Sequence, residues 1–414
     1  MLSLTKEITY KDDKCKVYKK RDDEKMHKED KPILEEICLT RNLSESTRKN
    51  YEQSIRSYTE SQGLTLKELL IEAEEEEEKG VRLKHRNVKK RLIIFQNYLL
   101  NDKGLSKSTI KKQVQIIRNI YNHFEIELPK IPKLNEKHVR DYEPIYYDDL
   151  PSKELIQEAL KISKPNMTAV ILFIVSSGCA REETLSLSIQ DFITATEEYH
   201  NSTDIHDVLN ELKHQDNIVP IFKLKRRKTS QYYYTFCSPE ATDAIVHYLE
   251  SRTDLLTPDK QLFKFEKSYF QKKFIEINNL LGGNKKGCYG IFRSHMLRKF
   301  HASNLARGEN GLTVEEIDSL QGRSKNKTHN SYFLDDPQEL KKKYISNIDK
   351  VLINYDKREL TFESPEVLEL KKKAAELEKE NAEIKQNINK AVDDRISEVF
   401  NEYGIEEILR KHGL

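Results

Sequence analysis

Residues that interrupt helices are scarce in this chain. Only 13 glycines and 11 prolines occur among its 414 residues, roughly half the share in an average globular protein. Because these two residues most often end a helix, helices can run far along this sequence. Hydrophobic residues make up 37% and charged residues 34%, which leaves enough apolar material for sizeable cores under polar surfaces. The sequence therefore predicts a mainly α-helical protein with a small antiparallel β-sheet.

Composition also narrows the compartment and the kinds of partner. No stretch approaches the run of about 18 apolar residues that a membrane span needs, and the first residues contain no apolar signal region. The net charge is only +2, so a polyanion would have to meet local basic patches. We expect a cytoplasmic protein. The cysteines show no zinc-ligand or disulfide spacing, which favours a reducing compartment; they are Cys15, Cys38, Cys179, Cys237 and Cys288.

Hydrophobic periodicity divides the chain into five parts. Residues 1–34 are rich in Lys, Asp and Glu without an apolar period, and we expect a charged arm. Four helical stripes follow in 35–128. Residues 129–145 contain prolines and show no hydrophobic period, which indicates a linker. Residues 146–355 combine helical patterns with two β-rich runs joined by a basic turn, and form a second domain.

The last part, 362–414, contains a heptad pattern. Apolar side chains alternate at three and four residues while Glu and Lys fill the flanks. This spacing predicts a coiled-coil seam, and the alternative is one long helix packed on its own domain. The inner positions are Val367, Leu370, Ala374, Leu377, Asn381, Ile384, Ile388 and Ala391.

Three motifs occur in a fixed order in the second domain. The first is Gly178-Cys179-Ala180-Arg181-Glu182-Glu183, followed by leucines. The second is His295-Met296-Leu297-Arg298-Lys299, a little over a hundred residues further on. The third is Leu320-Gln321-Gly322-Arg323, and Tyr332 stands nine residues after its arginine.

In order and spacing these motifs resemble the tyrosine recombinase, or phage-type integrase, family, most closely its archaeal members. The resemblance covers roughly residues 35–350. It implies the family's catalytic fold, preceded by a four-helix SAM-like core-binding domain. It also implies an enzyme that breaks and rejoins DNA strands.

The resemblance assigns roles to individual residues. It implies Tyr332 as nucleophile, Arg181, His295 and Arg298 at the phosphate, and Lys228, in the basic turn, as the family's catalytic lysine. A register shift would place that role on Lys225 instead.

The third motif departs from the family pattern. Most members carry His or Trp after the Gly of this motif, where this chain has Arg323. A permanent cation thus replaces a neutral ring. His329, six residues later, is the alternative candidate, although the register favours Arg323.

The residue types fit phosphoryl transfer without a cofactor. Charge accumulates on the non-bridging oxygens of a phosphodiester under attack and must be met by fixed donors. The planar forks of Arg181 and Arg298 suit phosphate. A tyrosine has an ordinary pKa near 10, so Tyr332 needs a cationic site to become a nucleophile. Lys228 can protonate the leaving 5′ oxygen as a general acid, and neither metal nor ATP is required.

Basic runs in both domains are candidates for contact with duplex DNA, since phosphate neutralisation dominates such binding. The alternative is ordinary solvated helix faces. The candidate DNA-binding residues are Arg82, Lys84, Arg86, Lys89, Lys90, Lys107, Lys111, Lys112, Lys225, Arg226 and Arg227.

Three functions remain open at this point. The first is a site-specific recombinase or integrase of a mobile element that acts as a homo-oligomer, in particular a tetramer, on DNA in the nucleoid. The second is relaxation of supercoils in the manner of a type IB topoisomerase. The third is a non-catalytic DNA-binding relative, for which Arg323 is the hint.

Overall fold

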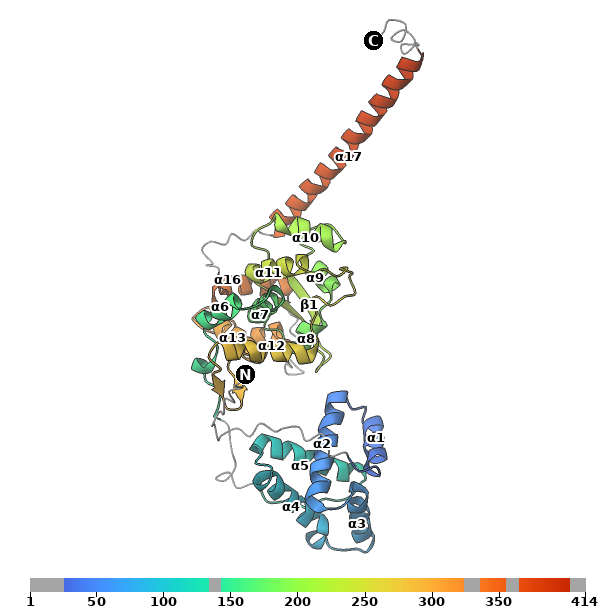
Figure 1. The fold of residues 1–414 in the computed structure, drawn as a ribbon, viewed down its shortest axis with the longest axis vertical. Coiled ribbons are helices and arrows are strands. Elements are labelled where there is room, and N and C mark those ends of the chain that lie inside the picture. Colours follow the sequence, from blue (N-terminus) through green and yellow to red (C-terminus); the bar gives the residue numbers. More distant parts are fainter. Residues whose placement is uncertain (1–25, 134–142, 324–335, 355–364, 403–414) are drawn as a thin grey trace, which may run out of the picture. The chain divides into compact units, whose positions relative to one another are not determined.

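The computed structural model describes residues 26–133, 143–323, 336–354 and 365–402. The chain divides into two compact units, Met1–Pro144 and Ile145–Leu414, which are coloured along the sequence in Figure 1. The described residues are mostly helical with two small antiparallel strand pairs, which confirms a mainly α protein with a small antiparallel sheet. In these residues no helix is both long and apolar enough to cross a membrane.

The first unit is a cluster of helices around aromatic side chains. Tyr58 and Tyr121 share a hydrogen bond of 2.8 Å between their hydroxyl oxygens, and the edge of Tyr58 meets the ring of Phe95. All three are buried, so this pair of phenols satisfies its polar atoms inside the core. The helices are α1 Asp30–Thr40, α2 Glu45–Gln62, α3 Leu66–Glu78, α4 Asn87–Asn101 and α5 Lys107–His123, with a 3₁₀ turn at Leu83–His85.

The expectation of four helices here misses α1, which begins inside the stretch assigned to the charged arm. Leu34 and Ile37 of α1 are buried in the unit's core. The carboxylate of Asp30 accepts hydrogen bonds from the backbone N–H groups of Leu66 and Lys67 at the start of α3. The polar composition of this stretch hid a short helix that buries Leu34 and Ile37 and binds the start of α3 through one oxygen of Asp30.

The second unit is organised around α7, Pro165–Ser177. Ten of its thirteen residues are buried, as expected for a helix that is apolar on every side. Its most extensive contacts are with α11 and α13, and it lies between these two helices in Figure 1. The helices of this unit are α6 Lys153–Lys161, α7, α8 Arg181–Ser186, α9 Ile189–Ala195, α10 Ile205–Lys213, α11 Pro239–Glu250, α12 Lys267–Leu280, α13 Ser294–Leu305, α14 Val314–Leu320, α16 Pro337–Ser346 and α17 Pro365–Glu402.

The two β-rich runs form an antiparallel hairpin, β1 Ile221–Lys225 and β2 Tyr232–Phe236, with Lys225 opposite Tyr232. Phe222 and Leu224 of β1 point into the core and alternate with exposed lysines. This confirms the expected hairpin with its basic turn.

A second strand pair was not anticipated. It joins β3, Lys285–Lys286, to β4, Tyr289–Gly290. The two-residue turn between them starts at Gly287, whose φ of 63° suits such hairpin turns. Strands of two residues are too short to produce a periodic pattern.

Candidate functional site

The C-terminal end of α7 is the anchor of the site. Gly178 ends the helix with a φ of 63°, and a Cβ there would lie 2.5 Å from the Nδ1 atom of His301. Only glycine fits this combination of backbone conformation and close packing.

The last carbonyls of α7 are held by side chains from three distant segments. Tyr344 donates to the carbonyl of Ser176 at 2.9 Å, and Thr235 donates to that of Ser177 at 2.7 Å. Arg298 donates to the carbonyl of the next residue, Gly178. Since a helix end leaves its last carbonyls without intrahelical partners, these contacts fix where the chain leaves α7 for Arg181.

Arg298, on α13, is a buried guanidinium whose hydrogen bonds go to main-chain carbonyls. It is 6% exposed and donates to the carbonyls of Gly178 and, at 2.8 Å, Gln321. Burial lowers its pKa, and repulsion from Arg226 and Arg323 adds to this effect. Within the described ranges no carboxylate forms an ion pair with it. An arginine stays charged at neutral pH, so the site contains a buried cation that can take an anion.

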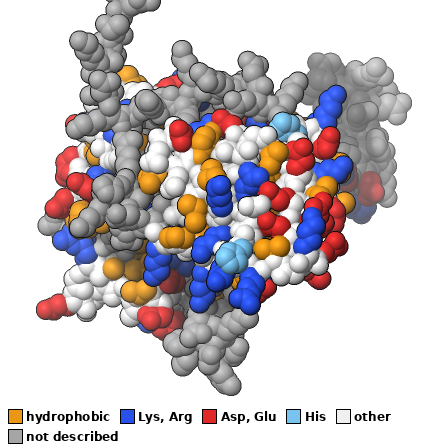
Figure 2. Space-filling view, turned by 90° about the horizontal axis from the view of Figure 1, so that it is seen from below, with side chains coloured by type: hydrophobic (Ala, Val, Ile, Leu, Met, Phe, Trp, Pro, Cys, Tyr) orange, Lys and Arg blue, Asp and Glu red, His pale blue; other side chains and the backbone are white. Residues whose placement is uncertain are grey.

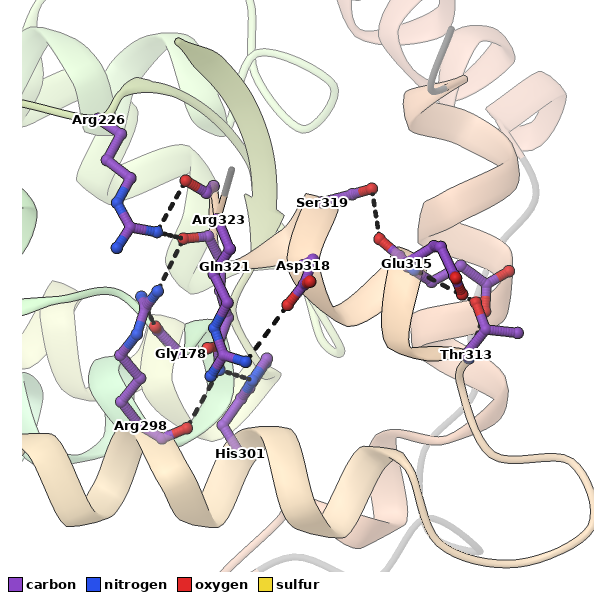
Figure 3. Close-up of polar contacts among 12 residues, drawn as sticks. Gly178, Arg226, Arg298, His301, Thr313, Glu315, Asp318, Ser319, Gln321 and Arg323 are labelled. Atoms are coloured by element: carbon purple, nitrogen blue, oxygen red, sulfur yellow. Dashed lines mark hydrogen bonds and ion pairs between the residues drawn. The ribbon is translucent and has the colours of Figure 1, made fainter. Parts of the chain in front are cut away.

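Arg226 connects the hairpin to the same turn that Arg298 binds. Its Nη1 atom donates to the carbonyls of Gln321 at 3.0 Å and Gly322 at 2.7 Å. Gly322 in turn packs against Tyr233 of β2, where a Cβ would lie 2.5 Å from the ring. Figure 3 shows Arg226 and Arg298 converging on the turn that follows α14. Carbonyls of the third motif thus join the basic hairpin to the second motif.

His301 and Gln321 support this arrangement and were not predicted. The Gln321 Nε2 atom donates to the Arg298 carbonyl at 3.1 Å and lies 3.0 Å from Nδ1 of His301. His301 is fully buried, and burial followed by repulsion from Arg298 and Arg323 lowers its pKa to about 3. The ring is therefore neutral and accepts through Nδ1. Its position three residues after Arg298, on the same helix face, was the available signal.

Arg181 is the first residue of α8, three residues after Gly178. Its Nη2 atom lies 3.0 Å from Oε1 of Glu182, and that carboxylate also pairs with Lys267 at 2.6 Å. The guanidinium is partly exposed, although its Nε atom is buried without a hydrogen-bond partner. Arg181 thus lies three residues after the carbonyl that Arg298 binds, and its side chain is accessible.

His295 lies one turn before Arg298 on α13 and its ring is exposed. Partial desolvation lowers its pKa, and nearby cations, chiefly Lys299 and Arg293, lower it further. A neutral ring at pH 7 can accept a proton, which is what a general base requires.

The two candidate lysines of the hairpin differ in their surroundings. Lys225 ends β1, and its Nζ atom lies 5.4 Å from the ring centre of Tyr232. Lys228 is exposed in the turn, and in the part of the chain that the structure covers no hydrogen bond, ion pair or ring contact reaches it. Lys228 is thus the less restrained of the two.

Arg323 follows Gly322 at the edge of the described residues. Its Nη1 atom lies 3.2 Å from Oδ1 of Asp318, so an acid partly neutralises it, in contrast to Arg298. The predicted nucleophile Tyr332 and the alternative His329 both lie outside the described residues.

The basic residues predicted in the first unit lie in different environments. Arg86 is buried, donates to the Val81 carbonyl and pairs with Glu77 at 2.9 Å. Lys112 is exposed and donates to Asn50. The remaining residues of the set are exposed or half-buried: Arg82, Lys84, Lys89, Lys90, Lys107 and Lys111. The face in Figure 2 carries Lys and Arg among Asp and Glu, without one continuous basic field.

No group of three or more His, Cys, Asp or Glu side chains that could hold a metal ion occurs among the described residues. The candidate site is instead a set of cations from three motifs and a hairpin. The side chains of Arg298 and Arg226 join these segments by hydrogen bonds to backbone carbonyls that are 23 to 120 positions away in the sequence.

Neither a protein-family model nor a curated protein matches the sequence. Solved structures do resemble it. The XerA recombinase is 18% identical with a TM-score of 0.31, covering 76% of this chain and 96% of that one. The XerH recombinase bound to its difH substrate is 16% identical with a TM-score of 0.42, covering 75% and 82%. The Tn1549 transposon integrase in complex with transposon right end DNA is 13% identical with a TM-score of 0.45, covering 75% and 96%.

Proposed function

We propose that this chain is a site-specific DNA recombinase that cleaves and rejoins strands through a covalent bond between Tyr332 and a 3′ phosphate. One observation carries the proposal. Arg298 is a buried cation held by the carbonyls of Gly178 and Gln321, with no carboxylate partner among the described residues. Taking an unpaired charge out of water costs several kcal/mol, and a phosphodiester oxygen would offset that cost.

The cations around Arg298 suit the other oxygens of such a phosphate. Arg181 starts α8 beside the Gly178 anchor and has an accessible fork. Arg323 is a weaker donor to the phosphate, because Asp318 already pairs with it. His295 lies one turn before Arg298 on α13, and we assign to it the binding of the phosphate or the removal of the proton from Tyr332.

In the proposed reaction the oxygen of Tyr332 forms a bond to phosphorus while the bond from phosphorus to the 5′ oxygen breaks. The tyrosine proton passes to His295 or solvent, and Lys228 protonates the leaving 5′ oxygen. The phosphotyrosine preserves the energy of the phosphodiester, so attack by another 5′ hydroxyl reverses the step on a new partner. No metal or ATP enters this sequence.

Duplex DNA is the proposed partner, with four subunits exchanging four strands. The proposed phosphate contacts away from the reacting bond are exposed or half-buried lysines and arginines of both units. Arg86 is left out because Glu77 pairs with it. Arg226 is left out because it donates to the same Gln321 carbonyl as Arg298, which puts it beside the proposed reacting phosphate and not away from it. The set is Arg82, Lys84, Lys89, Lys90, Lys107, Lys111, Lys112, Lys225 and Arg227.

Covalent capture tests this proposal. The protein is incubated with fragments of genomic DNA and denatured, and the attached strands are sequenced. We expect adducts at a defined DNA sequence. They should form equally well in the presence of EDTA, because side chains, and not a metal ion, neutralise the charge on the phosphate. Tyr332→Phe removes only the attacking oxygen, so it should abolish the adduct while fragment binding stays within about twofold.

Tyr289→Phe is the matched control, since Tyr289 is an exposed tyrosine of the same unit. Adducts from Tyr332→Phe at the level of the unmodified chain would refute the assignment of the nucleophile. If the unmodified chain binds DNA but forms no adduct, the result would favour the non-catalytic DNA-binding alternative. Relaxation of a supercoiled plasmid without joining of two sites would favour the topoisomerase alternative.

A further inference from the structure

Helix α17 exposes a stripe of large apolar side chains. Leu370 is 66% exposed, Leu377 59%, Ile384 54% and Ile388 56%. These residues are inner positions of the predicted seam. The alternative, in which the helix packs on its own domain through this stripe, disagrees with these exposures. A stripe of this length in water is an interaction surface.

The helix is attached to its own unit through a different face. Leu368 packs against the main core of the unit. Lys372 donates to the carbonyl of Glu197, and the Nζ atom of Lys379 lies 3.5 Å from Oε1 of Glu211. In a heptad register with the stripe at positions a and d, these three residues fall at b, f and f, on the outside of a coiled coil. The attachment therefore leaves the seam accessible.

The charges beside the seam select a partner of the same sequence. Lys373 and Glu380 occupy g positions, and Glu378 and Lys385 occupy e positions. In a parallel, in-register pair each g residue faces the e residue five positions later in the other helix. Lys373 then faces Glu378 of the second copy, and Glu380 faces Lys385. Both contacts join opposite charges, and each occurs twice.

The same residues disfavour a fully overlapping antiparallel pair. That arrangement places Glu378 against its own copy and Lys385 against Lys371, so like charges meet. It also places Asn381 opposite Leu377, where the amide lacks a polar partner. In the parallel pair Asn381 meets Asn381, an arrangement that typically sets register in two-stranded coils.

We propose that α17 binds a second copy of this chain as a parallel, in-register, two-stranded coiled coil over residues 367–391. The seam ends there because Arg395 occupies the next inner position. The exposed Val392 and Ile396 lie off the stripe. The small knobs Ala374 and Ala391 make the interface weak. This association does not depend on the DNA chemistry proposed above.

Charge-swapped full-length chains test the interface by sedimentation equilibrium. One variant carries Lys373→Glu and Lys385→Glu, and the other carries Glu378→Lys and Glu380→Lys. Each variant alone should associate at least about tenfold more weakly than the unmodified chain, because both contacts become repulsive. Mixing the two should restore association. The matched control, Glu376→Lys with Glu383→Lys, makes the same charge change as the second variant but at outer c positions. It should associate like the unmodified chain.

A cysteine pair tests the orientation. Asn381→Cys should form an interchain disulfide under mild oxidation because parallel a positions face each other, whereas Lys379→Cys, at an outer position, should cross-link no more than the unmodified chain. A chain that stays monomeric up to about 100 µM would overturn the proposal. So would swapped variants that associate as well as the unmodified chain, a mixture that does not recover, or equal cross-linking of the two cysteines.

Discussion

Arg86 and Arg91 of the first unit and Arg298 of the second unit have different kinds of partner. In the first unit Arg86 pairs with Glu77 at 2.9 Å, and Arg91 binds both oxygens of Glu72 at 3.1 and 3.0 Å. In the second unit Arg298 has only carbonyls as partners among the described residues. A carboxylate cancels the charge and leaves a structural contact, whereas carbonyl dipoles orient the fork and leave the charge available to an anion. This difference is the reason why the proposed function assigns the phosphate to Arg298 and not to Arg86.

The largest expected effect separates these two kinds of arginine. Arg298→Gln should lower the rate of DNA cleavage by about 10²–10³-fold, as loss of one transition-state donor typically does. Arg86→Gln should leave the cleavage rate within about twofold but lower stability by about 1–2 kcal/mol through the lost ion pair. Single-turnover cleavage and thermal unfolding without DNA measure both effects. Equal loss of cleavage in the two variants would invalidate the comparison.

The two hairpin lysines differ in a similar way, because Lys225 contacts the ring of Tyr232 and Lys228 has no such contact among the described residues. Lys228→Ala should slow cleavage by about 10²-fold, the usual share of a general acid. A substrate with sulfur in place of the leaving 5′ oxygen should restore the rate, because a thiolate leaves without protonation. Lys225→Ala, which removes a lysine held over Tyr232, serves as the control. Sulfur rescue of Lys225→Ala instead would transfer the catalytic role to Lys225.

The last expected effect is on stability and not on cleavage, and it concerns the histidine beside Arg298. Burial holds the pKa of His301 at about 3, below its ordinary value near 6.5. The unfolded chain therefore binds a proton on this ring between pH 6.5 and 3 while the folded chain does not. The resulting stabilisation is complete above pH 6.5 and is lost as the pH falls towards 3. It amounts to about 3 kcal/mol between pH 6.5 and 4.

His301→Gln should therefore flatten the acid side of the stability profile relative to the unmodified chain. Urea unfolding at several pH values measures it, with His206→Gln at an exposed position as the control. If His301→Gln keeps the full pH dependence, the ring is not held neutral by its surroundings.

Local sequence was sufficient where structure depends on neighbours along the chain. The helical patterns of the second domain correspond to helices such as α7, and its two β-rich runs correspond to the hairpin of β1 and β2. Helix starts also carry local signals, such as the reciprocal hydrogen bonds of Thr313 and Glu316 at α14. Helix α1, which the sequence did not predict, shows the limit, because Asp30 binds backbone N–H groups that lie 36 and 37 residues away.

The sequence by itself determined the helical class, the hairpin, and the order and spacing of the motifs with their cations. Only the tertiary structure decided which cations are neutralised. Arg86 and Arg226 stand in similar basic runs, yet one meets Glu77 and the other the carbonyls of Gln321 and Gly322. These partners are brought together by packing between segments up to 96 residues apart. A hydrogen bond tolerates displacements of only a few tenths of an ångström, so residue order alone cannot assign it.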